Sequence, residues 1–98
     1  MIVAEVVGNV WGQYKHPSLD SRRLMLVRPI DPLTEEPLGE AVMAVDIGVG
    51  ASPGSIVLVM DEGGSARQML GDERAPVRTV ICGIIDTVAM YGSEKRYA

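Results

Sequence analysis

The side chains that could carry chemistry are few and widely spaced in this sequence. The chain has one histidine, His16, and one cysteine, Cys82. A hydrolase or transferase needs a nucleophile beside a base, a pair of carboxylates or a metal cluster, and a zinc site usually needs four ligands. His16 precedes Pro17 in a polar loop, and Cys82 lies in an apolar run, where a thiol usually packs as a small hydrophobe. We therefore expect no catalytic, cofactor-binding or metal site.

Carboxylates are the remaining candidates for proton transfer. Four aspartates end or interrupt apolar segments, where such side chains commonly cap turns; they are Asp46, Asp61, Asp72 and Asp86. We interpret them as turn caps. The sequence leaves one alternative open, in which two subunits jointly form a cleft and the chain is a small enzyme or an enzyme's regulatory subunit.

A glycine-rich stretch over residues 48–54 is the one candidate for a phosphate loop. It lacks the Gly-Lys-Ser/Thr ending of that motif, and it leads toward another strand rather than into a helix N-terminus. We interpret it as a tight connection with glycines at positive φ, which could also be a place where several subunits meet at a symmetry axis. The candidate axis residues are Gly48, Val49, Gly50, Ala51, Ser52 and Gly54.

Five apolar segments must position these side chains. They span residues 2–11, 23–28, 40–47, 55–60 and 77–89, with Gly, Pro and Asp clusters between them. Short β-branched runs in series predict a barrel or a sandwich. The two prolines of 31–39 predict a surface hairpin loop there. A capping box at Ser65–Gln68 with Gly71 as a left-handed stop predicts one short helix.

The composition excludes two classes of partner. The chain has 98 residues, a formal net charge of −4 and 4% aromatic residues. Lys and Arg supply most non-specific nucleic-acid affinity, and aromatic side chains supply stacking platforms for single strands, so nucleic acid is a poor partner. No apolar run reaches the ~18 residues of a membrane helix, and the first residues lack the basic region of a signal peptide. We expect one domain, residues 1–98, soluble in the cytoplasm.

The apolar content exceeds what so small a domain can bury. Hydrophobic residues make up 47% of the chain, yet a domain of this size buries only about two-thirds of the surface that its unfolded chain exposes. Segments 2–11 and 77–89 are apolar on both faces, whereas a half-exposed antiparallel strand would alternate. Neighbouring copies could cover their outer faces. The predicted subunit contacts are Val3, Val7, Trp11, Ile81, Ile85 and, at the helix start, Ser65 and Arg67.

The order of short motifs along nearly the whole chain resembles the EutN/CcmL-type vertex proteins of bacterial microcompartments and carboxysomes. The motifs are Gly8-Asn9-Val10, Ala44-Val45-Asp46, Val49-Gly50-Ala51, Gly63-Gly64-Ser65-Ala66-Arg67 and Gly83-Ile84-Ile85-Asp86. Each motif is short, and their order is the specific signal. The chain departs from the family's pattern at Ser52, Gly64 and Arg78.

The resemblance implies a mainly β fold: a five-stranded OB-like closed β-barrel with one short helix. It further implies a cyclic homopentamer without enzyme activity, which closes the vertices of a cytoplasmic protein shell tiled by hexameric shell proteins. Edge residues that would contact the hexamers are Lys15, Arg22 and Arg23. The alternative is an OB-type binding module for an oligonucleotide or an oligosaccharide.

Overall fold

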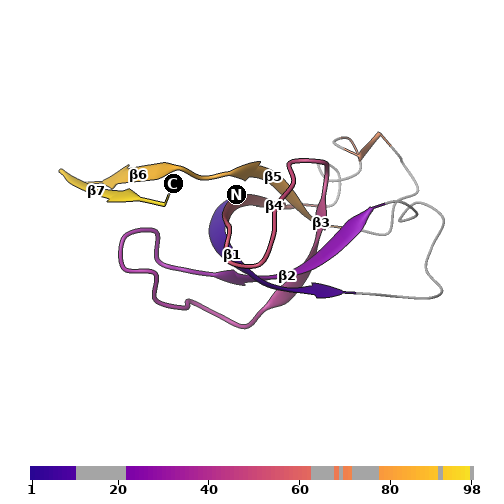
Figure 1. The fold of residues 1–98 in the computed structure, drawn as a ribbon, viewed down its shortest axis with the longest axis horizontal. Helices are drawn as coiled ribbons and strands as arrows, with labels where there is room; N and C mark the ends of the chain where they lie inside the picture. Colours follow the sequence, from indigo (N-terminus) through magenta and orange to yellow (C-terminus); the bar gives the residue numbers. More distant parts are fainter. Residues whose placement is uncertain (11–21, 63–67, 69, 72–77, 91, 98) are drawn as a thin grey trace.

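The computed structural model describes residues 1–10, 22–62, 68, 70–71, 78–90 and 92–97 (Figure 1). The sequence-based expectations for Trp11, Lys15, His16, Ser65 and Arg67 lie outside these residues. Within the described ranges the chain forms the strands β1 (Ile2–Val10), β2 (Arg23–Pro29), β3 (Val42–Asp46), β4 (Ile56–Asp61), β5 (Thr79–Ile84), β6 (Thr87–Met90) and β7 (Ser93–Arg96). None of its helical residues belongs to a helix long and apolar enough to cross a membrane.

The first five strands close into a barrel in the order β1-β2-β3-β5-β4, with β4 returning to β1 (Figure 1). Strands β3 and β5 are parallel, with Val45 opposite Val80, and the other neighbours are antiparallel. The prediction of a mainly β fold with a closed five-stranded barrel is therefore confirmed. The barrel leaves no open sheet edge among these strands, which removes the unpaired backbone groups that promote aggregation.

The barrel interior is filled by small and β-branched side chains. Its buried cluster consists of Ala4, Val6, Met25, Val27, Ala44, Ala51, Val57, Val59 and Ile81. Strands β1, β2 and β4 supply alternate residues to it, as the period of two requires, while β3, β5 and the loop after β3 supply one residue each. Burial of one such Val or Ile side chain contributes about 1.5–3 kcal/mol. Ile81 is fully buried in this cluster, so it belongs to the barrel core and is removed from the predicted subunit contacts.

A second apolar cluster lies on the outside of the barrel. It joins the buried Val45, Leu70 and Val80, against which Leu24, Ile47 and Met60 pack. The end of β3, at Ala44 and Val45, and the start of β5, at Val80 and Ile81, are therefore buried on both faces, which explains why these stretches do not alternate with polar residues. Neighbouring copies were predicted to cover the last apolar segment, whereas Leu70 of the same chain packs against its outer Val80.

The predicted helix falls mostly outside the described residues. The described part contains Gln68 and Leu70 in helical conformation. Gly71 follows with φ of 69°, and its amide donates to the Gln68 carbonyl at 3.1 Å. The expectation of a left-handed glycine at this position is thus confirmed.

The last apolar segment differs from the prediction of one strand over 77–89. Strand β5 ends at Ile84, and β6 begins at Thr87 and pairs with β7 in a separate hairpin. The hairpin extends to one side of the barrel (Figure 1). The Tyr97 hydroxyl donates to the Pro32 carbonyl at 2.5 Å, and Lys95 pairs with Glu35 at 3.0 Å. These contacts hold the hairpin to the predicted surface loop after β2.

Candidate assembly faces and the Asp46 loop

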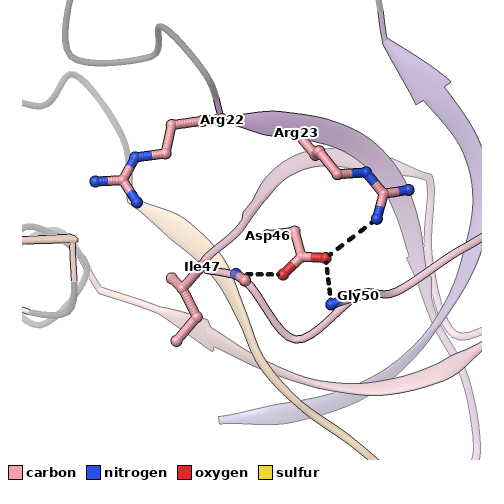
Figure 2. A pocket seen from close by; sticks show the side chains of 6 residues that line it. Arg22, Arg23, Asp46, Ile47 and Gly50 are labelled. Carbon is pink, nitrogen blue, oxygen red and sulfur yellow. Dashed lines mark hydrogen bonds and ion pairs between the residues drawn. The ribbon is translucent and has the colours of Figure 1, made fainter.

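Asp46 organises the glycine-rich loop between β3 and β4. It is the last residue of β3, and its carboxylate accepts four backbone hydrogen bonds, including the one from Gly50 that Figure 2 draws. Oδ1 accepts from the amides of Gly48 and Val49, both at 2.7 Å. Oδ2 accepts from the amides of Gly50 at 3.1 Å and Ala51 at 2.9 Å. Four consecutive amides therefore converge on one side chain.

The charge of this buried carboxylate is stabilised by its surroundings. The Asp46 side chain is 1% exposed and lies 3.8 Å from a guanidinium nitrogen of Arg23. Burial is the largest single influence on the pKa of Asp46 and raises it. The loop amides, followed by the charge of Arg23, outweigh burial and hold this pKa below its ordinary value. Asp46 is therefore ionised at neutral pH.

The loop geometry explains why the backbone amides of these residues do not act as a phosphate loop. Gly48 and Gly50 have φ of 120° and 80°, which turn successive amides toward one point. Such an arrangement binds anions, but here its anion is the Asp46 carboxylate of the same chain. The interpretation of Asp46 as a turn cap is confirmed.

The other aspartates have different surroundings. Asp61 accepts from Arg78 Nε at 3.1 Å and from the Thr79 hydroxyl at 3.0 Å, in an exposed position. Asp86 is exposed, and its backbone carbonyl accepts from the Tyr97 amide at 2.7 Å. Asp72 lies outside the described residues. Within the described part of the chain, no three His, Cys, Asp or Glu side chains are grouped as a metal site would require.

The candidate axis residues do not all face outward. Ala51 is fully buried in the barrel core, and Val49 packs against that core. The remaining candidates are exposed: Gly48, Gly50, Ser52 and Gly54. The loop therefore presents mainly backbone, the Ser52 hydroxyl and the exposed ring of Pro53 to its surroundings, while two side chains anchor it.

Two apolar faces lie on the outside of the barrel, one on each side of β1. The first, here called the β1–β3 face, consists of Gly8, Leu26 and Met43, which are register partners across β1, β2 and β3. Leu26 lies between the core residues Met25 and Val27, so it points outward. Met43 is 53% exposed. A large apolar side chain on this face is thus open to solvent in the single chain.

The second, here called the β1–β5 face, consists of Val3, Leu58 and Gly83, which are register partners across β1, β4 and β5. Leu58 lies between the core residues Val57 and Val59, so it points outward. Val3 and Leu58 are half-buried. The two faces differ in composition and in exposure, as the two sides of a head-to-tail contact do.

The predicted subunit contacts coincide with these faces only in part. Val3 belongs to the β1–β5 face. Val7 is 38% exposed and is the extra residue of a β-bulge between β1 and β2. Ile85 is half-buried after β5, and its amide donates to the Ile56 carbonyl at 2.8 Å. Leu26, Met43 and Leu58 are not among the contacts predicted from sequence, although the alternation within segments 23–28 and 55–60 separates Leu26 and Leu58 from their neighbours.

Curated relatives match most of the chain. The carboxysome shell vertex protein CcmL of Gloeobacter violaceus is 39% identical over 90 residues, which cover 92% of this chain and 87% of the relative. The bacterial microcompartment shell vertex protein EutN of Escherichia coli K12 is 36% identical over 92 residues, which cover 94% of each chain.

Solved structures of similar proteins share the fold. The structure of Gloeobacter violaceus CcmL has a TM-score of 0.84 at 36% identity, covering 96% of this chain and 94% of its own. The pentameric microcompartment shell protein GrpN from Rhodospirillum rubrum has a TM-score of 0.79 at 33% identity, covering 92% and 99%. The model of the family described as "Ethanolamine utilisation protein EutN/carboxysome" matches residues 1–86. The chain therefore belongs to the EutN/CcmL family.

Proposed function

We propose that this chain is a structural protein that assembles into a ring of five identical subunits and closes a vertex of a bacterial microcompartment shell. Its relatives are named shell vertex proteins, and one of the structures that it resembles is described as a pentameric shell protein. The observation that carries the proposal is the pair of unlike apolar faces on either side of β1. A cyclic ring requires two different patches on each subunit.

In this ring the β1–β3 face of one subunit packs against the β1–β5 face of the next. Met43 on the first face is 53% exposed, so association removes its side chain from water. Gly83 on the second face carries no side chain, which allows a neighbouring side chain to approach the strand. Val7 and Ile85 lie at the margins of the contact, whereas Trp11, Ser65 and Arg67 lie outside the described residues and stay predicted contacts. Permanent interfaces are typically apolar in this way.

Arg23 approaches Asp46, which holds the loop over residues 48–54, to 3.8 Å, so Arg22, Arg23 and this loop occupy one region of the subunit. In this proposal that region, together with Lys15, forms the edge that contacts the hexameric shell proteins, and the predicted placement of the loop at the five-fold axis is not kept. The assembly works by its geometry and has no catalytic step.

The experiment that tests this function is native mass spectrometry of the full chain. Five chains of 10.5 kDa give a particle of about 52 kDa. Met43→Asp places a carboxylate in the proposed contact and is expected to yield monomers, since burying an unpaired charge is unfavourable. Leu38→Asp is the matched control, because Leu38 is 66% exposed in the loop after β2 and belongs to neither face. A monomeric wild-type chain, or dissociation by Leu38→Asp alone, would refute the proposal.

A further inference from the structure

A pocket of about 240 Å³ opens where the start of β2 meets the loop after β3 (Figure 2). It is lined by Arg22, Arg23, Asp46, Ile47, Gly48 and Gly50. The lining residues thus include two arginines and one aspartate. This local excess of positive charge lies on a protein whose formal net charge is −4.

The carboxylate in the pocket cannot serve Arg23 as a hydrogen-bond acceptor. A carboxylate offers about four acceptor positions, and Asp46 accepts four amide hydrogen bonds from its own loop. The approach of Arg23 Nη1 to Asp46 Oδ2 is 3.8 Å, which is longer than a hydrogen bond. Arg23 is therefore attracted to Asp46 while its donors remain available, and its side chain is 52% exposed.

Arg22 forms another wall of the pocket in a fixed orientation. Its Nη2 donates to the Leu70 carbonyl at 3.0 Å. A guanidinium has five N–H donors, so this one bond orients the group and leaves capacity for a further acceptor. Figure 2 shows Arg22 and Arg23 extending to opposite sides, with Asp46 and Ile47 below them. The pocket thus has a cation on each side.

We propose that this pocket binds a single oxyanion, either a carboxylate or a phosphate group, with Arg23 as its direct ligand and Arg22 flanking it. Arginine matches the planar, two-oxygen geometry of such groups. Charge-assisted hydrogen bonds of this kind are shorter and stronger than neutral ones. Partial enclosure strengthens the attraction relative to open water.

The oxyanion that binds in the pocket can come from either of two sources. In a shell, an Asp or Glu side chain of an adjacent shell protein reaches the pocket and anchors the edge contact. This source rests on the proposed function. A free anion of the surrounding solution is the other source, and it requires no assembly.

The test uses the full chain at low ionic strength in two separate titrations followed by amide NMR spectra. One titrant is inorganic phosphate, and the other is a capped peptide with two adjacent glutamates. Saturable shifts of the Gly48 and Gly50 amides are expected. Arg23→Gln is expected to weaken binding about tenfold or more. Arg78→Gln, the matched control, removes an exposed arginine whose partner is Asp61 and should leave binding unchanged.

The outcomes distinguish a protein carboxylate from a free anion as the ligand, and they test the oxyanion pocket separately from the pentameric ring. Tighter binding of the peptide supports a protein carboxylate, and tighter binding of phosphate supports a free anion. The absence of saturable shifts, or equal weakening by Arg23→Gln and Arg78→Gln, overturns the oxyanion site. If Arg23→Gln perturbs the fold, Arg22→Gln replaces it. A pentamer that binds neither titrant overturns the pocket alone, whereas a monomer that binds one overturns the ring alone.

Discussion

Arg23 and Asp46 lie directly opposite each other on the antiparallel strands β2 and β3, and their charged groups approach to 3.8 Å. Asp46 is buried, whereas the Arg23 side chain is 52% exposed. The aspartate therefore faces the loop behind it, and the arginine faces outward. One cross-strand pair thus joins the buried carboxylate that holds the loop to an exposed guanidinium group.

The first prediction concerns the Asp46 carboxylate. Asp46→Asn replaces one acceptor oxygen by a donor NH₂ group, which then faces two backbone amides of the loop. Loss of these bonds to a charged acceptor is expected to lower the free energy of unfolding by about 2–4 kcal/mol. Chemical denaturation at a fixed protein concentration measures the change. Asp86→Asn should leave the free energy of unfolding unchanged within experimental error, because the Asp86 side chain is exposed.

The second prediction concerns pH. The pKa of Asp46 is lowered on folding from its ordinary value of 3.8, so its ionised form stabilises the folded state above that value. This contribution is lost as pH falls through the folded pKa. Wild-type stability should therefore decrease from pH 7 toward about pH 3 more steeply than that of Asp46→Asn. Equal slopes in denaturation series at several pH values would contradict the described role of Asp46.

The third prediction concerns backbone conformation in the loop. Gly50 has φ of 80°, and an added Cβ would meet no atom within 4 Å. Gly50→Ala should therefore destabilise the chain by about 1–2 kcal/mol through backbone strain alone. Gly39→Ala is the control, since Gly39 also has open space but no positive φ. Thermal or chemical unfolding should show a loss of stability for Gly50→Ala and none for Gly39→Ala. A larger loss of stability in Gly39→Ala than in Gly50→Ala would be inconsistent with the loop geometry.

The fourth prediction concerns the C-terminal hairpin. Tyr97→Phe removes the hydroxyl that donates to the Pro32 carbonyl, and a two-stranded hairpin is marginally stable without such contacts. Hydrogen exchange of β6 and β7 amides should become faster, while exchange of core amides such as that of Val27 should not change. Arg96→Gln alters an exposed side chain of the same hairpin and should have no effect. Faster exchange throughout the barrel in Tyr97→Phe would argue against a local attachment.

Much of the barrel could be predicted from sequence because its strands are short, apolar and separated by turn residues. The hairpin could not, because β7 reads Ser-Glu-Lys-Arg and carries no apolar alternation. Its stability comes instead from contacts with Pro32 and Glu35, more than 50 residues earlier in the chain. Long-range contacts of this kind leave no local signal.

The candidate contacts were harder to assign than the strands. Ile81 and Val80 are both apolar, and alternation alone does not say which of them faces the barrel interior. The bulges between Val6 and Gly8 and between Leu58 and Val59 shift the register, which changes the side to which later residues point. Coverage of Val80 by Leu70 likewise depends on tertiary packing.

Strand β1 belongs to both apolar faces, through Gly8 on one side and Val3 on the other. In a ring built through these faces, β1 takes part in the contacts with both neighbours. A bulge increases the local twist of its strand, so the extra residue at Val7 sets the angle between those two contacts. Any change in that twist is repeated at each junction, and its effect on the closure of the ring is multiplied by the number of subunits.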